Sequence, residues 1–236
     1  MTSRFYTNSI DVNQGTALLE EGEAHHLLHV MRLKMGEEVT LFDGKGNAWR
    51  GRITKTDRRR AELELLDQIT VATKSSREIV LAVAPPKGDR FRWLVEKVTE
   101  LGINRLIPLK TERTVVDPGA GKMDKLKQTM ISACKQCGRN EFLAFESQRS
   151  WEVCLEEYHQ THHLLIAHPN GAELRDIFVK LEPSQSLLIG VGPEGGFTEE
   201  EIDQALQAQA SLVSLGDSIL RTETAAISLS AAVMLQ

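Results

Sequence analysis

The sharpest chemical feature of the sequence is a glycine-rich segment from Gly190 to Gly196, which reads Gly-Val-Gly-Pro-Glu-Gly-Gly. Glycines have no side chain, so they leave backbone N–H and C=O groups open to a ligand. The segment contains the G-x-G-x-x-G string of dinucleotide-binding proteins, and Asp217 follows about twenty residues later, as a ribose-binding acid would. The alternatives are a nucleotide-like ligand and a tight turn that binds nothing.

The helix after this segment starts too late for a dinucleotide site. Thr198 and Glu201 form a capping box, and Phe197 with Ile202 supplies a hydrophobic staple, so the helix begins after the last glycine. In a dinucleotide fold the helix begins within the motif, and its N-terminus meets the pyrophosphate. Glu194 would also repel phosphate. The segment therefore predicts bare backbone at the carboxyl end of a strand, where parallel sheets bind ligands.

A second loop with chemical potential runs from Leu215 to Ala226. It follows a strand-like run, contains Gly216, and leads into a terminal helix through hydroxyl residues that can cap it. Arg221 and Glu223 bring opposite charges to the same predicted edge. The apolar part of the loop would wall a flat ring such as adenine, whereas the alternative is a surface Arg–Glu pair without a ligand.

A Cys-x-x-Cys pair, Cys134 and Cys137, raises the question of zinc. Zinc would need two further ligands of suitable spacing, and Cys154 is the only other cysteine. Both residues of the pair lie on the apolar stripe of a predicted helix, so we expect two buried thiols and no metal. Arg139 follows this lysine-rich helix and is better placed to meet RNA or substrate.

Two kinds of element must position these residues. From residue 78 onward, near-continuous apolar strands alternate with helical patterns, which predicts a parallel sheet covered on both faces. The strand-like runs are 78–84, 106–109, 164–167, 187–191 and 212–215, and the helical patterns are near 91–101, 123–137, 172–180, 199–209 and 222–236.

Residues 1–72 instead predict a small antiparallel barrel. Runs 39–42 and 48–53 flank the turn Asp43-Gly-Lys-Gly-Asn47 as a hairpin, 61–66 alternates as a strand, and a short helix covers about Gly22 to Arg32. Thr70 to Ser76 is the predicted linker, so the expected domains are residues 1–72 and 73–236.

Composition limits the class of protein. With 236 residues, 41% of them hydrophobic, the chain is too apolar to be wholly disordered and suits one large domain or two modest ones. No apolar stretch near the start is long enough for a signal peptide or a membrane span. Three cysteines clustered in one half fit a reducing compartment, so we expect a cytoplasmic protein.

The formal net charge of −5 hides an asymmetry along the chain. Residues 1–72 carry 10 basic and 11 acidic side chains, residues 73–150 carry 15 and 9, and residues 151–236 carry 3 and 13. The middle third is basic enough to meet a polyanion, and the last third is not.

Six motifs together resemble the ribosomal RNA small subunit methyltransferase E family. They are Pro86-Lys87-Gly88-Asp89-Arg90, Glu96–Gly102, Thr111-Glu112-Arg113, Gln136-Cys137-Gly138-Arg139, Gly192–Phe197 and Ile219–Ala225. The resemblance spans essentially the whole chain. It implies an S-adenosylmethionine-dependent enzyme that methylates N3 of one uridine in 16S ribosomal RNA, within an assembled 30S particle.

The resemblance also implies an architecture: an N-terminal PUA-like barrel that binds RNA and a C-terminal SPOUT α/β domain with a trefoil knot. It further implies a homodimer with its site at the subunit interface. The implied cofactor-binding residues are Leu165, Ile166, Ala167, Gly192, Glu194, Gly195, Gly196, Leu215, Gly216, Ser218, Ile219, Leu220, Thr224 and Ala225. The expected RNA-binding residues are Arg58, Arg59, Lys87, Arg90, Arg113, Lys125 and Arg139.

The implied chemistry suits the residues. S-adenosylmethionine carries a sulfonium cation and no phosphate, so an acidic glycine loop can accept it. Uracil N3–H is a weak acid, and an arginine that stabilises the developing uracilate would make methyl transfer feasible. We expect Arg139 or Arg221 to do this, with Glu223 orienting one of them.

Three alternatives stay open beside this interpretation: a SPOUT methyltransferase for ribose 2′-O, a nicotinamide-dependent oxidoreductase, and a non-catalytic RNA-binding adaptor. Two departures from the family pattern stand out. Lys135 occupies a position where we expect an acidic residue, and the sequence stops at Gln236, inside the terminal helix.

Overall fold

A computed structural model describes residues 2–70, 77–116 and 123–235 of the chain. They form two compact units: Met1–Thr73 together with Ile131–Phe142, and Lys74–Met130 together with Leu143–Gln236. All but the first residue of the predicted linker, Thr70 to Ser76, lies outside the described residues. The segment from Ile131 to Phe142, which carries Arg139, therefore groups with the N-terminal unit.

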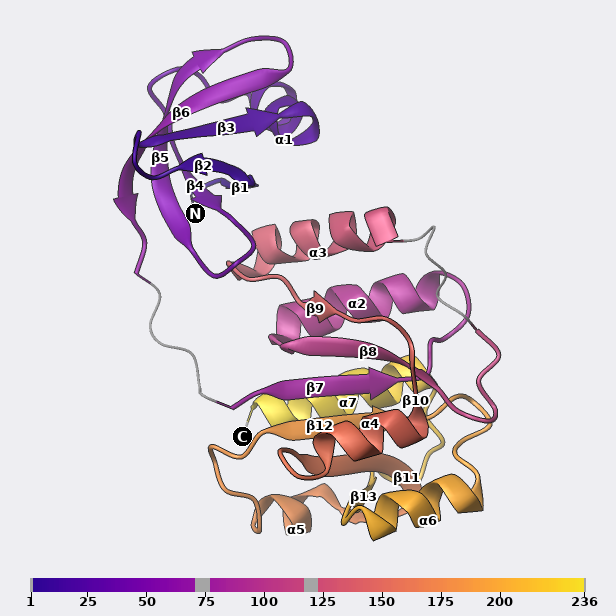
Figure 1. Cartoon of the computed structure of the whole chain (residues 1–236). Coiled ribbons are helices and arrows are strands. Elements are labelled where there is room, and N and C mark those ends of the chain that lie inside the picture. Colours follow the sequence, from indigo (N-terminus) through magenta and orange to yellow (C-terminus); the bar gives the residue numbers. More distant parts are fainter. Residues whose placement is uncertain (1, 71–76, 117–122, 236) are drawn as a thin grey trace. The chain divides into compact units, whose positions relative to one another are not determined.

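The N-terminal unit is built on one curved six-stranded sheet in the order β1-β4-β5-β6-β3-β2 (Figure 1). The predicted hairpin is confirmed, because β4 and β5 pair antiparallel around Gly44 and Gly46, whose φ angles are 72° and 107°. One pair differs from the expected antiparallel barrel, since β1 runs parallel to β4. The strands are β1 (Arg4–Tyr6), β2 (Ser9–Asp11), β3 (Thr16–Glu20), β4 (Glu38–Phe42), β5 (Ala48–Thr56) and β6 (Arg60–Gln68).

The helical segment of this unit is less regular than its sequence predicts. Helix α1 (Glu21–His25) continues into a π-helix, η1 (His26–Val30), instead of one α-helix. Ala24 and Leu27 are fully buried and join the apolar core of the sheet. The spacing of apolar residues therefore located the segment correctly but did not reveal its wider turns.

The C-terminal unit contains the predicted parallel sheet. Its order is β10-β8-β7-β12-β11-β13, with β9 paired to β8, and every pair is parallel. All five residues of β7 and all five of β12 are buried, as expected for central strands. The strands are β7 (Ile79–Val83), β8 (Arg105–Lys110), β9 (Ala144–Phe145), β10 (Arg149–Ser150), β11 (His163–Glu173), β12 (Leu187–Val191) and β13 (Ser211–Ser214).

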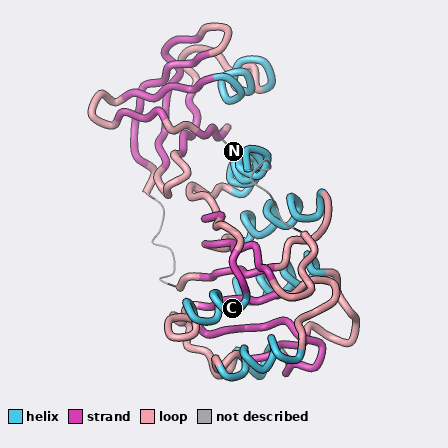
Figure 2. Tube along the Cα trace, turned by 45° about the vertical axis from the view of Figure 1, so that its right-hand side comes forward, coloured by secondary structure: helices cyan, strands magenta, loops and turns pink. Residues whose placement is uncertain are grey.

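Helices cover this sheet (Figure 2). They are α2 (Asp89–Leu101), α4 (Trp151–Tyr158), α5 (Leu174–Phe178), α6 (Glu199–Gln207) and α7 (Thr222–Met234), whereas α3 (Met123–Cys137) is divided between the two units. Helix α7 packs on α2, β7 and β12, while α4 packs against α6. Gly102 ends α2 with φ 92°, as the sequence predicts.

Helix α4 is absent from the sequence expectations, although a signal for it exists. Trp151, Cys154, Leu155 and Tyr158 follow helical spacing and are all buried, and the Ser150 side chain caps the helix by accepting from the Val153 N–H. Strand β11 is also longer than expected, because it continues past a register shift against β13 between Ala167 and Ala172.

The sheet order places β12, which comes late in the chain, between β7 and β11. A trefoil knot in this unit stays a prediction. Among the described helices, none combines the length and the apolar character needed to cross a membrane.

The buried Trp151 gives a test of this core. Its indole Nε1 donates to the Glu201 carbonyl oxygen at 2.8 Å, and its ring stacks near Phe197 at 4.6 Å between centroids. We expect Trp151→Phe to lower the free energy of unfolding by about 1–3 kcal/mol, because a buried hydrogen bond is lost. Urea unfolding followed by circular dichroism measures this change. The matched change Trp93→Phe, at a side chain 46% exposed, should shift stability by less than about 0.5 kcal/mol; equal effects would contradict the assignment.

Candidate functional site

The candidate site lies in the C-terminal unit, at the edge where parallel strands end. Because β7, β8, β12 and β13 belong to one parallel sheet, the loops after them leave the same edge. These loops contain the residues 84–88, 111–114, 192–198 and 215–221. The two segments singled out by their sequence, the glycine-rich loop 192–198 and the loop 215–221, therefore leave the same edge of the sheet, on either side of β11.

The glycine-rich loop is tightly built. A Cβ on Gly192 would lie 3.1 Å from the Phe197 ring, and one on Gly195 would lie 3.3 Å from the Arg113 Cδ. Gly196 has φ 70°, a conformation that side chains disfavour. Helix α6 begins only at Glu199 and carries the predicted capping box, so the late helix start is confirmed.

Glu201 does more than cap α6. Its carboxylate is buried, with Oε2 accepting from the Thr198 N–H at 2.9 Å and Oε1 accepting from the Glu112 N–H at 2.8 Å. Glu112 follows β8, so this one carboxylate ties the loop after β8 to the loop after β12. The sequence predicts the contact within the capping box but carries no sign of the contact with Glu112.

Two arginines expected to bind RNA are held by this edge instead of projecting freely. Arg113 donates from Nη1 to the Gly195 carbonyl oxygen at 2.7 Å, although its side chain stays exposed. Arg90, at the start of α2, places Nη1 3.4 Å from Glu223 Oε1 and Nη2 3.4 Å from Glu194 Oε1. The Arg90 guanidinium thus links the glycine-rich loop to the first turn of α7.

Helix α7, which follows the loop 215–221, contacts the glycine-rich loop through its first residue. The Thr222 hydroxyl donates to the Gly192 carbonyl oxygen at 3.2 Å. Gly216 has φ 104°, and Ile219 is 92% exposed. The Arg221 side chain is exposed, and within the described residues its guanidinium makes no hydrogen bond or ion pair, so it is available to a substrate.

Strand β11 contains three residues that are predicted to bind the cofactor, Leu165, Ile166 and Ala167. The side chains of Leu165 and Ile166 are fully buried, and Ala167 is only partly exposed. Leu165 and Ile166 lie inside the sheet, paired with both β12 and β13, so their part in cofactor binding stays a prediction.

Arg139, the other predicted catalytic arginine, belongs to the N-terminal unit. Arg4 Nη2 donates to the Arg139 carbonyl oxygen at 3.2 Å and to the Asn140 Oδ1 at 2.6 Å, and Asn140 is buried. Burial lowers the pKa of the Arg139 guanidinium. Strand β1 therefore fixes the backbone on which Arg139 stands.

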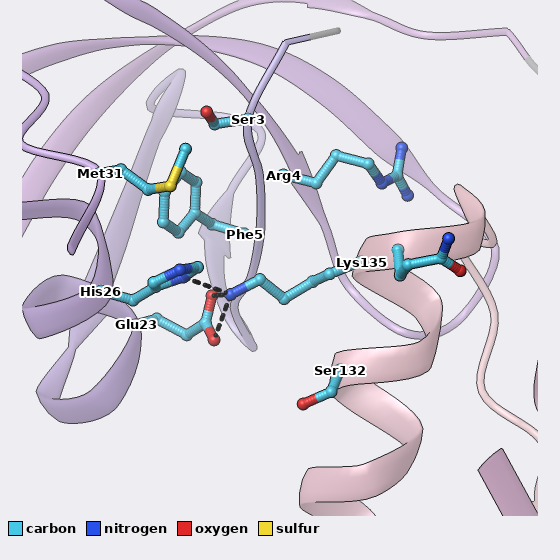
Figure 3. Close-up of a pocket in the computed structure, with 9 residues that line it drawn as sticks. Ser3, Arg4, Phe5, Glu23, His26, Met31, Ser132 and Lys135 are labelled. Atoms are coloured by element: carbon cyan, nitrogen blue, oxygen red, sulfur yellow. Dashed lines mark hydrogen bonds and ion pairs between the residues drawn. The ribbon is translucent and has the colours of Figure 1, made fainter.

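A cavity of about 500 Å³ in the same unit is lined by β1, α1, η1 and the end of α3 (Figure 3). Lys135 Nζ points to both oxygens of Glu23, each at 2.9 Å, and to His26 Nδ1 at 2.8 Å. Burial, and then the Lys135 ammonium, lower the pKa of His26. These contacts use the three donors of Lys135, so it fastens α3 to the barrel and offers no free donor to a ligand.

The remaining basic candidates are exposed. Arg58 and Arg59 lie in the turn between β5 and β6, Lys87 precedes α2, and Lys125 lies on α3. Each is accessible to a phosphate group, and nothing in the structure assigns them a partner in RNA.

The cysteines differ from expectation at one position. Cys134 and Cys154 are buried, and burial raises the pKa of Cys154 to about 12. Cys137 is exposed, so the prediction of a buried thiol there is wrong. Cys137 is the last residue of α3, and Gly138, with φ 84°, changes the direction of the chain there. The apolar core that covers the rest of the stripe therefore does not extend to Cys137. Within the described parts of the chain, no group of histidine, cysteine and acidic residues could hold a metal ion.

Comparison with known proteins adds independent findings. A family model described as an RNA methyltransferase domain matches residues 73–234, and one described as an RNA methyltransferase PUA domain matches residues 19–66. Ribosomal RNA small subunit methyltransferase E of Rickettsia conorii is 30% identical over 244 residues, covering 99% of this chain and 95% of that protein. The Synechocystis protein of the same name is 28% identical over 229 residues, covering 95% and 75%. The crystal structure of the Neisseria gonorrhoeae protein of that name, bound to S-adenosyl methionine, superposes with a TM-score of 0.88 at 33% identity, covering 100% of this chain and 98% of that one.

The Glu201 bridge generates a prediction about the site. An amide can accept at only one of its two terminal atoms, so Glu201→Gln leaves one of the two backbone N–H groups unpaired. We expect a loss of about 1–3 kcal/mol in unfolding free energy and faster hydrogen exchange at the Glu112 or Thr198 amide. Glu200→Gln removes the same charge at an exposed position and is the control. Hydrogen exchange read by mass spectrometry checks this, and identical exchange in the two variants would disprove the bridge.

Proposed function

Because this chain belongs to the ribosomal RNA small subunit methyltransferase E family, we propose that it is an S-adenosylmethionine-dependent methyltransferase of 16S ribosomal RNA. The observation that carries the proposal is the contact of the glycine-rich loop 192–198 with Thr222, the first residue after the loop 215–221, at the carboxyl edge of a parallel sheet. Parallel sheets bind their ligands at this edge. The Neisseria relative, bound to S-adenosyl methionine, supports the choice of methyl donor.

The residues at this edge fit such a donor. Gly192 and Gly195 let Phe197 and Arg113 pack closely on the loop, and the exposed Glu194 suits a positive sulfonium better than a phosphate. When bound, the donor supplies an activated methyl group. The proposed binding residues are those implied by the family resemblance, Leu165 and Ile166 among them.

For the reacting atom we propose N3 of a uridine. N3 becomes a competent nucleophile once its proton has left, so the site must stabilise negative charge on the uracil ring. Arg221 is exposed at the site edge, and Arg139 is the second candidate for this role. Methylation of a ribose 2′-O is the alternative, and it would need no such stabilisation of a base.

The N-terminal unit is proposed to bind RNA. A match to an RNA methyltransferase PUA domain and the exposed Arg58 and Arg59 support this role. We propose that residues 1–72 and 73–236 are the two domains and that the second has a SPOUT fold with a trefoil knot. We also propose a homodimer with the site at its interface. The substrate is proposed to be 16S RNA within an assembled 30S particle in the cytoplasm.

The modified nucleoside provides the direct test. We expect small-subunit RNA from cells lacking the gene to lose 3-methyluridine, and a plasmid copy of the gene to restore it. Mass spectrometry of the digested RNA measures both. Unchanged 3-methyluridine would refute the proposal, whereas loss of a 2′-O-methylated nucleoside would support the alternative.

Calorimetric titration with S-adenosylmethionine and with NAD separates a methyltransferase from an oxidoreductase, and binding of neither would favour an RNA-binding adaptor.

The two arginines can be tested separately. Removing a group that stabilises developing charge typically slows a reaction about 10²–10³-fold, so we expect a loss of that size in single-turnover methylation for Arg139→Ala or Arg221→Ala. Arg175→Ala, at an exposed arginine on α5, is the control and should keep the full rate. Rates close to wild type in both variants would remove the arginines from the mechanism.

A further inference from the structure

Glu223 is a buried carboxylate with one oxygen left over. It lies in the first turn of α7 and is 4% exposed. Oε1 lies 3.4 Å from Arg90 Nη1, whereas Oε2 is buried and accepts no hydrogen bond from any described residue. A buried acceptor without a donor costs about 1–3 kcal/mol, and more when it is charged. Such an oxygen calls for a donor that arrives with a ligand.

Glu223 lies beside the two loops of the candidate site, so a ligand bound there could supply that donor. The neighbouring Thr222 hydroxyl bonds to Gly192, and the Arg90 guanidinium that holds Oε1 also reaches Glu194. The free oxygen is therefore close to both loops of the candidate site. Glu223 is distant in sequence from Arg90 and Glu194, but all three residues belong to the same unit.

The charged groups around Glu223 keep an acceptor there. The Arg90 guanidinium approaches Glu223 from α2, and Lys87 precedes that helix. Glu194 shares the Arg90 guanidinium, and Arg221 precedes Glu223 by two residues. The N-terminus of α7 also favours a negative side chain in the first turn. Arg90 and the end of α7 thus hold this carboxylate in place, with Oε2 left as an acceptor.

We propose that Glu223 Oε2 accepts the N3 proton of the target uridine, and that Arg90 is a positioning residue that holds Oε1. This inference rests on the proposed function. In the step, the N3 proton passes to Oε2, the N3 electron pair forms a bond to the methyl carbon, and the carbon–sulfur bond breaks with its electrons returning to sulfur. Glu223 is left protonated and loses that proton to water after the products leave.

This role differs from orienting an arginine of the reaction. Among the described residues, the recorded partner of Glu223 is Arg90, whose guanidinium is already shared between two carboxylates. An oxygen needed only for orientation would have its donor in place. The unpartnered Oε2 instead matches the one donor on the uracil ring that methylation removes.

The test is Glu223→Gln in the full-length protein, with small-subunit particles that lack the modification as substrate. Glutamine keeps the size of the side chain but cannot take up a proton. A general base contributes about 10²–10⁴-fold, so we expect a single-turnover rate lower by at least about 10²-fold near neutral pH. The residual rate should rise about tenfold per pH unit, because hydroxide must then remove the proton. Affinity for S-adenosylmethionine, measured by calorimetry, should stay unchanged.

Two further variants complete the experiment. Glu223→Asp keeps a carboxylate, so we expect an intermediate rate with the pH profile of the wild type, and circular dichroism verifies that each variant is folded. Glu152→Gln removes an exposed carboxylate from the first turn of α4 and should match the wild type. A Glu223→Asp enzyme no faster than Glu223→Gln would overturn the proposal. If Glu223→Asp alone folds, its rate is compared with that of the wild type, and a loss of about 10²-fold or more would overturn the proposal.

The outcomes separate this inference from the proposed function. Weak S-adenosylmethionine binding with an unchanged pH profile in Glu223→Gln would make Glu223 a cofactor ligand and overturn its role as proton acceptor. An unchanged rate and pH profile would also overturn it. If the wild type neither binds S-adenosylmethionine nor forms 3-methyluridine, the proposed function itself fails.

Discussion

The pairing of β12 with both β7 and β11 is the constraint on which the site depends. Gly190 makes it possible, because a Cβ there would lie 2.7 Å from Ile166 Cδ1 and 3.3 Å from the Trp151 ring. With β12 parallel to both neighbours, the glycine-rich loop must leave the sheet at the edge shared with the loops after β7 and β13. The apolar, fully buried strand thus determines where polar chemistry can be placed.

Charge is separated along this chain according to the partner that each part is proposed to meet. The C-terminal third carries 13 acidic and 3 basic side chains and holds Glu194 in the glycine-rich loop, which suits a cationic methyl donor. The middle third is basic, which suits RNA. Arg90 lies between Glu194 and Glu223, and its positive charge reduces the repulsion between these two carboxylates. The net charge of the whole chain reports neither property.

Prediction from sequence succeeded where a signal was local. Apolar runs located β7 and β12, the Thr198–Glu201 pair located the start of α6, and Gly102 located the end of α2. It failed where the outcome depended on distant neighbours. The parallel pairing of β1, the π-helix η1 and the exposure of Cys137 each depend on what the rest of the unit packs against the segment. The contact of Arg113 with the Gly195 carbonyl oxygen likewise has no signal in the sequence, and its role in RNA binding stays a prediction.

The sequence by itself determined most of the longer strands and helices, the two conspicuous loops and the family, because periodicity, capping and motif spacing operate over a few residues. Only the tertiary structure decided which side chains share a site. Arg90 and Glu223 are 133 residues apart, and Glu112 and Glu201 are 89 apart. It also decided that residues 131–142, with Arg139, belong to the barrel unit. Such contacts arise from sheet order and packing, whose long-range geometry leaves no periodic pattern in a single sequence.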